Sequence, residues 1–495
     1  MAKKSYRPWQ PHQPYLLPPS TADWLPEGHL AYFILDLVEQ LDLSGIEDVL
    51  QARDPRGARS YDPMMMVALL LYAYSVGVFS SRRIERGTFE DVAFRFICNE
   101  LHPHFTRIAA FRREHRVALE GLFLQVLKLC QRAGLVKLGH LAVDGSKIQG
   151  NASKHKAMSY KRMEALDLRL TGEIQDLLER AEAMDSSEDA RFGSGQREED
   201  LPEELRRREQ RRARLREAKQ ALEAEAKQAR AQRHRELAQG CRARASAATT
   251  SKRKALNETL ASKHDVEASE LDPRDDDDDE PPFTTPDGLP KHRTRTVKTG
   301  KPHPNAQRSF TDPDSKLMES GGVFLQGFNC QAAVDDAHQI IVAQSLTNQP
   351  PDAGNLTPML DLVRQNVGTY PVVVSADSGY WNERVAEDGR ERNVEVLIAT
   401  ERQRHWDADR TVTEGPPPPG LDARQRMRWK LRTDAGRALY ARRKVIVEPV
   451  FGQIKDARGF RRFLLRGLEK VALEWSLLST THNLLKLFRA QTAAA

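Results

Sequence analysis

The chain has 495 residues, a length that exceeds one compact core and predicts two or three domains. Hydrophobic residues make up 39% and charged residues 29%, so the composition is polar but globular. The four cysteines stand alone, without CxxC pairs or Cys/His ligand spacing, which argues against a zinc site and a disulfide framework and fits a reducing compartment.

The net charge of +6 hides an uneven distribution of basic residues. Residues 201–255 contain 17 Lys and Arg against 7 Asp and Glu. Such an excess is typical of a segment that binds a polyanion, and equally of a solvated helix, so charge alone does not decide between them.

The N-terminal part of the chain is predicted to be helical. Residues 1–20 are rich in proline and aromatic residues and predict an extended arm. The apolar run 64–79 follows the helix-start pair Asp62-Pro63 and is shorter than the roughly 20 residues of a membrane-spanning helix, so we expect a buried helix. Three further segments show helical spacing of apolar residues, namely 29–41, 88–97 and 108–129. No apolar stretch follows the basic N-terminus, so no signal peptide is expected.

The next segment changes from strand to charged helix. Residues 141–143 predict a short buried strand that ends in an Asp144-Gly145 turn. Residues 159–255 predict two long helices packed as an antiparallel hairpin, the second largely solvated. The apolar stripe of the first helix comprises Met163, Leu166, Leu170, Ile174 and Leu177.

Strand patterns return after residue 320. Residues 322–335 and 339–346 predict a hairpin that turns at Asp335-Asp336. Two further strands are expected at 372–375 and 394–399. Helices are expected at 355–367, 381–389, about 435–457 and 470–489. This order predicts an α/β fold with a mixed sheet, interrupted by the charged hairpin.

Three acidic residues, Asp144, Asp377 and Glu448, are the leading candidates for a functional site. Taken singly, each aspartate resembles a turn former and Glu448 an acid at a helix start. Taken together, both aspartates follow apolar strands, whose carboxyl ends form the binding edge of an open α/β sheet. Carboxylates gathered from distant positions are a usual way to hold two hard divalent cations for phosphoryl transfer.

Basic and aromatic residues surround Glu448 in the sequence. Lys455 lies seven positions downstream, about two helical turns, so both side chains are expected on one face. Tyr440 and the triplet Arg442-Arg443-Lys444 lie upstream. These residues suit a DNA backbone passing the site; the alternative is an ordinary solvated helix with a few salt bridges.

The segments LAVDGSKIQGNAS, VSADSGYW and VEPVFGQIK resemble the DDE transposases of bacterial insertion sequences. The resemblance implies an RNase H-like catalytic core in which Asp144, Asp377 and Glu448 bind two Mg²⁺ ions, with Mn²⁺ as a substitute. It also implies a Tyr–Arg–Glu–Lys group that contacts the transposon end. Tyr440 and Lys455 match that group, and either Arg443 or Lys444 can fill its arginine position. Here the spacing from Tyr440 to Glu448 is one residue longer than the family pattern.

The segment HPHFTRIAAFRREHR, which begins at His102, resembles a helix-turn-helix recognition segment. Its candidate DNA contacts are Arg107, Arg112 and Arg113, because a reading helix needs such side chains in the major groove. The alternative, held equally, is the basic surface of a packed helix.

The resemblance implies a division into four parts. A helical DNA-binding domain spans 1–135, the RNase H-like core spans 136–155 and 309–490, an inserted helical hairpin spans 156–270, and a flexible acidic and basic linker spans 271–308. The expected partners are double-stranded DNA, as transposon ends and target, and a second copy of the chain that forms a homodimer. We expect a cytoplasmic, nucleoid-associated location and no membrane.

Three other functions stay open at this point. The first is a metal-dependent nuclease without strand transfer, and the second is an inactive DNA-binding derivative of the same fold. The third, a coiled-coil scaffold built on 159–255, is disfavoured because the second helix has a weak heptad pattern.

Overall fold

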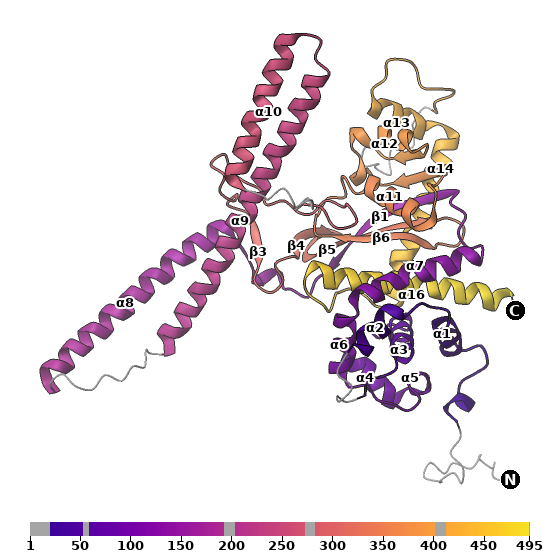
Figure 1. Cartoon of the computed structure of the whole chain (residues 1–495), viewed down its shortest axis with the longest axis horizontal. Coiled ribbons are helices and arrows are strands. Elements are labelled where there is room, and N and C mark those ends of the chain that lie inside the picture. Colours follow the sequence, from indigo (N-terminus) through magenta and orange to yellow (C-terminus); the bar gives the residue numbers. More distant parts are fainter. Residues whose placement is uncertain (1–19, 53–58, 193–202, 273–282, 401–411, 495) are drawn as a thin grey trace, which may run out of the picture.

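The computed structural model describes residues 20–52, 59–192, 203–272, 283–400 and 412–494. The fold is mixed α/β and 58% helical. Figure 1 shows a central sheet, a group of N-terminal helices beneath it, and long helical arms that project to one side. The predicted extended arm lies outside the described residues, apart from its last position. Within the described part of the chain, no helix is both long and apolar enough to cross a bilayer.

In the described part of the chain the main sheet has six strands, five of which follow the order β6–β5–β1–β7–β8. Their bounds are β1 (His140–Gln149), β5 (Val323–Asp335), β6 (Ile341–Thr347), β7 (Val373–Ala376) and β8 (Glu395–Ile398). The β6–β5 and β5–β1 pairs are antiparallel, whereas β1–β7 and β7–β8 are parallel. A further strand, β4 (Lys316–Ser320), pairs with the first part of β5. This mixed sheet with flanking helices confirms the predicted fold class.

The elements after β1 follow the predicted order. The hairpin of β5 and β6 and the strands β7 and β8 are confirmed. The helices are α11 (Leu356–Val367), α12 (Glu383–Glu391), α13 (Ala423–Arg432), α14 (Asp434–Ile446), α15 (Glu448–Gly452), the π-helical turn η4 (Gln453–Ala457) and α16 (Leu468–Ala494). Helix α13 was not predicted; it begins at a capping box in which Asp422 and Gln425 each bond the other's backbone amide.

The N-terminal region is helical, as expected, but two predicted helices are each broken in two. Its elements are η1 (Thr21–Trp24), α1 (Leu30–Val38), α2 (Ser44–Gln51), α3 (Pro63–Ser75), α4 (Ser81–Glu90), α5 (Val92–Ile97), α6 (Phe105–Glu114) and α7 (Arg116–Arg132). The helix predicted over 88–97 stops at Asp91, whose carboxylate accepts a 2.8 Å bond from the Ala93 amide and starts α5. The helix predicted over 108–129 is interrupted at His115, between α6 and α7.

Helix α3 confirms the prediction made for the longest apolar run. The Asp62 carboxylate caps its first turn by accepting bonds from the Met64 and Met65 amides at 2.7 and 3.2 Å, and Pro63 occupies the first helical position. From Met66 to the end of the helix every residue is buried. A helix that is apolar on all sides belongs in the interior, which is where α3 lies.

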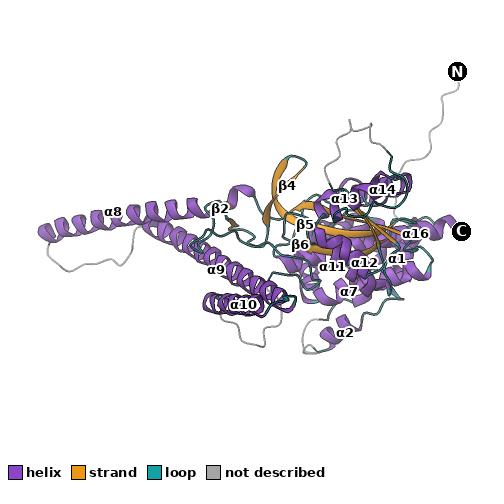
Figure 2. Cartoon of the chain, turned by 90° about the horizontal axis from the view of Figure 1, so that it is seen from above, coloured by secondary structure: helices purple, strands orange, loops and turns teal. Residues whose placement is uncertain are grey.

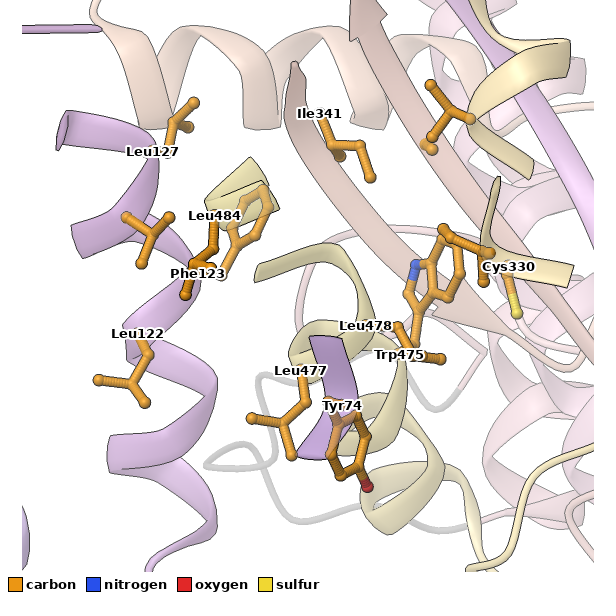
Figure 3. Packing of buried hydrophobic residues seen from close by; sticks show 14 of the residues in the cluster. Tyr74, Leu122, Phe123, Leu127, Cys330, Ile341, Trp475, Leu477, Leu478 and Leu484 are labelled. Atoms are coloured by element: carbon orange, nitrogen blue, oxygen red, sulfur yellow. The ribbon is translucent and has the colours of Figure 1, made fainter. Parts of the chain in front are cut away.

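The N-terminal helices and the sheet share one continuous hydrophobic core. Helix α16 connects them, because it packs against β6 on one side and against α7 and α3 on the other. Figure 3 shows Leu484 of α16 next to Phe123 of α7, and Trp475 of the same helix next to Cys330 of β5. Trp475 is fully buried and donates a 3.2 Å bond from its indole nitrogen to the Gln331 carbonyl. The C-terminal helix therefore fixes the sheet to the N-terminal region.

The inserted segment forms three helices rather than the expected two. These are α8 (Tyr160–Phe192), α9 (Glu203–Ser246) and α10 (Ser251–Leu271). Helix α9 packs against α8 near the start of its length and against α10 near its end. Figure 2 shows both helical pairs extending away from the sheet. The predicted stripe of α8 is confirmed, since Met163, Leu170 and Ile174 are buried. The two helices meet through Met163 and Leu170 of α8 and Leu215 and Ala218 of α9.

The expectation of a flexible linker over 271–308 is wrong for residues 283–308. This stretch is anchored by Leu289, which is fully buried in the main core, and by a 2.6 Å bond from the Ser345 hydroxyl to the Asp287 carboxylate. Its end forms β3 (Gln307–Ser309), which pairs with β2 (Ala157–Ser159) and closes the base of the insertion. Charge and proline content predicted disorder, but a few apolar and hydrogen-bonded anchors hold the segment. Its acidic run at 275–280 lies outside the described residues.

Candidate active site

Asp144 lies in the middle of strand β1, and not in a turn. The predicted Asp144-Gly145 turn is wrong, because β1 pairs with β5 without interruption from Leu141 to Gln149. Gly145 serves close packing instead: a Cβ at this position would overlap the side chains of Asp352 and Gln331. Because side chains alternate along a strand, Asp144 projects from the opposite face of the sheet.

Asp377 directly follows β7, the parallel neighbour of β1. Val143 pairs with Ala376, so the next residues in the two chains, Asp144 and Asp377, lie at adjacent positions at the same sheet edge. The Asp377 carboxylate accepts a 2.9 Å bond from the Gly379 amide and caps the short helix η3 (Ser378–Tyr380). The sheet itself thus brings together two residues that are distant in the sequence.

Glu448 is joined to this pair through Arg443. Glu448 is the first residue of α15, and its side chain is 53% exposed. The Arg443 guanidinium, 13% exposed, lies 3.3 Å from an Asp144 carboxylate oxygen through Nη1 and 3.8 Å from a Glu448 oxygen through Nη2. Arg443 therefore bridges Asp144 and Glu448, and Asp377 lies next to Asp144 on the neighbouring strand.

The electrostatics of the site favour binding of positive charge. Burial raises the pKa of Asp144 to about 6, Arg443 opposes this shift, and the negative charges of Asp377 and Asp352 add to it. Burial alone would lower the pKa of Arg443, but Asp144 and other nearby acidic groups raise it above its ordinary value. Carboxylates crowded at a partly buried edge are stabilised by a cation, and here Arg443 supplies that charge.

Arg443 and Lys444, the two candidates for the arginine position, have different surroundings. Arg443 points into the site, and its guanidinium carbon lies 6.0 Å from the centroid of the Tyr440 ring. Lys444 is exposed on the outer side of α14. Lys455 donates a hydrogen bond from Nζ to the Ser146 hydroxyl, two residues beyond Asp144 on the same face of β1. Burial lowers the pKa of Lys455 and raises that of Tyr440. Tyr440, Arg443 and Lys455 all reach the acidic centre.

A buried polar network lies on the other face of β1, beneath Asp144. The Asp352 carboxylate accepts bonds from Lys147 Nζ at 2.5 Å, Asn329 Nδ2 at 2.8 Å and Gln331 Nε2 at 2.9 Å. Gln331 in turn accepts a hydrogen bond from the hydroxyl of Tyr380, which lies in η3 next to Asp377. The network therefore links strands β1 and β5 to the loop that presents Asp377.

Sequence reasoning missed this network. Asp352 lies in a loop, where no periodic pattern marks it. One signal was available: Asn329 and Gln331 alternate with apolar residues in a strand that is buried on both faces. Buried amides need partners, so such alternation predicts a polar group packed against the strand.

The N-terminal arginines divide into two kinds. Arg107 and Arg113 are exposed on α6. Arg112 is buried, so its assignment as a DNA contact is wrong. Its guanidinium donates to the Tyr74 hydroxyl at 3.0 Å, to the Phe79 carbonyl at 3.2 Å, and to the Ser81 hydroxyl. Arg112 therefore holds α3 and the start of α4 against α6.

The fold and the site together define a class. A mixed sheet of RNase H-like strand order presents two aspartates at adjacent positions on the neighbouring strands β1 and β7, and Arg443 joins one of them to a glutamate from a later helix. This is the architecture of the DDE catalytic core.

Two models of transposase domains match parts of the chain. Residues 407–488 match a family model described as a transposase DDE domain, and residues 19–114 match one described as a transposase domain of the DUF772 type. The first match includes Tyr440, Arg443, Glu448 and Lys455, and the second includes α1 to α6. The two family models match separate parts of the chain and support a DDE-type transposase of an insertion sequence. No curated protein and no solved structure matches it.

Proposed function

We propose that the chain binds the inverted-repeat ends of an insertion sequence, cleaves them by metal-dependent phosphoryl transfer, and joins the 3′ ends to target DNA. The observation that carries this proposal is the placement of Asp377 next to Asp144 on neighbouring strands, with Arg443 bridging Asp144 and Glu448. Transposase family matches at both ends of the chain support it.

The donor set fits a pair of hard divalent cations. Three carboxylates offer the oxygen ligands that Mg²⁺ and Mn²⁺ prefer. Burial is the main cause of the raised pKa of Asp144, and the charges of Asp377 and Asp352 add to it, so a bound cation would favour the ionised carboxylate. Asp144, Asp377 and Glu448 would hold the ions, which when bound activate the attacking oxygen and stabilise the leaving oxygen.

The remaining side chains position DNA around this centre. Arg443 and Lys455 carry positive charge beside the acids and suit the phosphates that flank the cut. Tyr440 is half-buried against Arg443 and limits the orientation of its guanidinium. Lys444, exposed next to them, suits a phosphate farther along the strand.

We further propose a division of labour along the chain. Residues 1–135 bind DNA, with Arg107 and Arg113 available on the surface of α6, and residues 136–155 with 309–490 form the catalytic core. The insertion at 156–270 contacts DNA or a second protomer. Two protomers form a homodimer that holds the two ends of the element together.

The deciding experiment is a strand-transfer assay with a labelled duplex that carries the element's end. The wild-type chain with Mg²⁺ should yield cleaved ends and joined product, Asp144→Asn should yield neither, and the matched variant Asp48→Asn, at an exposed position of α2, should behave as wild type. Cleavage without joined product would indicate a nuclease. Binding without cleavage would indicate an inactive derivative, and unchanged cleavage by Asp144→Asn would refute the assigned centre.

A further inference from the structure

Three metal-ligating side chains converge between helices α9 and α10, on an element separate from the acidic centre. His234 comes from α9, and His264 and Glu267 come from α10. Nδ1 of His234 lies 3.1 Å from Nδ1 of His264 and 2.8 Å from Oε2 of Glu267. The third side of the triangle, from Nδ1 of His264 to the same carboxylate oxygen, measures 3.6 Å.

The helical hairpin explains why these side chains meet. Residues 247–250 join α9 to α10, and so short a connection makes the helices antiparallel neighbours. His264 and Glu267 are three residues apart and share one face of α10. His234 lies at the matching level of α9, and all three side chains are partly buried, with exposed fractions of 15%, 23% and 37% in sequence order.

The size of the triangle matches a tetrahedral cation. Ligands bonded at about 2.0–2.1 Å to a tetrahedral Zn²⁺ lie about 3.3 Å from one another. The three observed separations, 2.8, 3.1 and 3.6 Å, bracket that value. Each side chain offers one ligand atom, Nδ1 of either imidazole or a carboxylate oxygen, to the same space.

The packing of the hairpin shows what a bound ion would contribute. The buried cluster between α9 and α10 consists of Ala238, Cys241 and Ala261, small side chains that bury little apolar surface. Charged pairs supply further contacts, such as Arg235 with Asp272 at 3.1 Å, but ion pairs near the surface contribute little. A helical pair with so small a core is the kind of element that metals commonly stabilise.

We propose that His234, His264 and Glu267 form a binding site for one Zn²⁺ ion that clamps α10 to α9. Imidazole and carboxylate ligands select a transition metal over Mg²⁺, which separates this site from the all-carboxylate centre. The three residues leave a fourth tetrahedral position for water or for a ligand from a partner. The isolated cysteines had argued against zinc, but this site uses none of them.

The experiment uses the full-length chain, stripped of metal and then dialysed against Zn²⁺ in the presence of excess Mg²⁺. Bound zinc is counted by atomic emission, and Co²⁺ is titrated in parallel to follow the visible bands of a tetrahedral site. We expect one tightly bound Zn²⁺ per chain. His264→Asn and Glu267→Gln should each weaken binding by roughly 100-fold or more, whereas His338→Asn, at an exposed histidine, should not.

Two further measurements separate a failure of the zinc site from a failure of the proposed catalysis. Asp144→Asn should retain the Zn²⁺ ion, so failure of the proposed catalysis would leave this result intact. Zn²⁺ should slow amide hydrogen exchange in α9 and α10 of the wild type but not of Glu267→Gln. Equal zinc binding by wild type and both ligand variants, or none by the wild type, would refute the site and leave a hydrogen-bonded ion pair.

Discussion

The most informative single residue is Arg443. Sequence reasoning could not separate it from Lys444, because neighbouring residues on a helix differ by about 100° in direction and only packing decides which faces inward. The structure shows Arg443 against Asp144 and Glu448, with Lys444 in solvent. The same limit explains the wrong assignment of Arg112, whose burial against Tyr74 no local pattern marks.

Arg443 and Lys444 should respond differently to substitution. Arg443→Ala removes the cation that lies between two of the acids, and we expect cleavage to fall by roughly 100-fold in a single-turnover assay with end-containing duplex. Lys444→Ala should leave the cleavage rate of bound DNA near wild type. It should reduce the slope of the logarithm of the DNA-binding constant against the logarithm of salt concentration by about one. Equal effects of the two variants on cleavage would contradict this assignment.

Gly145 offers a second test at the residue scale. Gly145→Ala forces a methyl group into the space of Asp352 and Gln331, so we expect it to lower the free energy of unfolding by more than about 2 kcal/mol in urea titration. The control is Gly172→Ala on α8, where a Cβ meets nothing within 4 Å and the change should raise helix stability slightly. A neutral Gly145→Ala variant would contradict the observed close approach.

Among the elements, helix α16 carries a buried acid that makes its packing sensitive to pH. Glu474 is fully buried and accepts bonds from the Leu464 and Leu465 amides at 3.0 and 3.1 Å, which holds the loop before the helix. Burial raises its pKa from 4.5 to about 7, while those amides and Arg112 oppose the shift. The folded chain therefore favours the protonated carboxyl. The resulting stability is complete below about pH 4.5 and is lost as the pH rises through about 7.

Glu474→Gln should abolish this pH dependence. The amide keeps an acceptor for the loop and cannot ionise. The unfolding free energy of the variant should therefore exceed that of the wild type by an amount that grows from pH 5 to pH 8. The rise of the Glu474 pKa from 4.5 to about 7 corresponds to an increase on the order of 3 kcal/mol. Denaturant titrations at several pH values measure it, with the exposed Glu469→Gln as control. If the unfolding free energies of Glu474→Gln and the wild type differed by the same amount at every pH, the role of Glu474 would be refuted.

Periodicity predicted whether an element existed better than it predicted where the element ended. The hairpin of β5 and β6 was predictable because its alternating apolar residues meet a turn at Asp335-Asp336. The turn predicted at Asp144-Gly145 is absent, because strand pairing from Leu141 to Gln149 overrides the local preference of these residues for a turn. The break at Asp91 needed the capping bonds of its side chain, which a helical pattern does not reveal.

For the whole molecule, the outer part of the inserted helical pair α8 and α9 is the segment whose removal we expect to affect the folding of the core least. Glu173 of α8 lies 3.3 Å from Arg208 of α9, so the two helices run side by side at this level. A variant in which residues 177–204 are replaced by a four-residue glycine-serine loop can therefore close without moving the base of the insertion.

This shortened variant should keep the melting temperature of the core and lose two-ended DNA complexes in a native gel. The reason is that α8 and α9 project away from the sheet, where they suit DNA or a second protomer. A version with the same loop inserted after residue 192 and nothing removed serves as control. Full complex formation by the shortened chain would show that the outer part of this helical pair is dispensable.

The position of the insertion also sets the order in which the enzyme is made. Strand β1 ends at Gln149, and its antiparallel neighbour β5 begins at Val323. At typical rates of protein synthesis the first strand waits on the order of 10–30 s for that neighbour to leave the ribosome. Glu448 emerges later still, so the acids cannot assemble during most of translation. A message cut short before α14 would produce a fragment that contains residues 19–114 and lacks Arg443 and Glu448; on the proposed division of the chain, such a fragment would compete with the full protein for DNA ends.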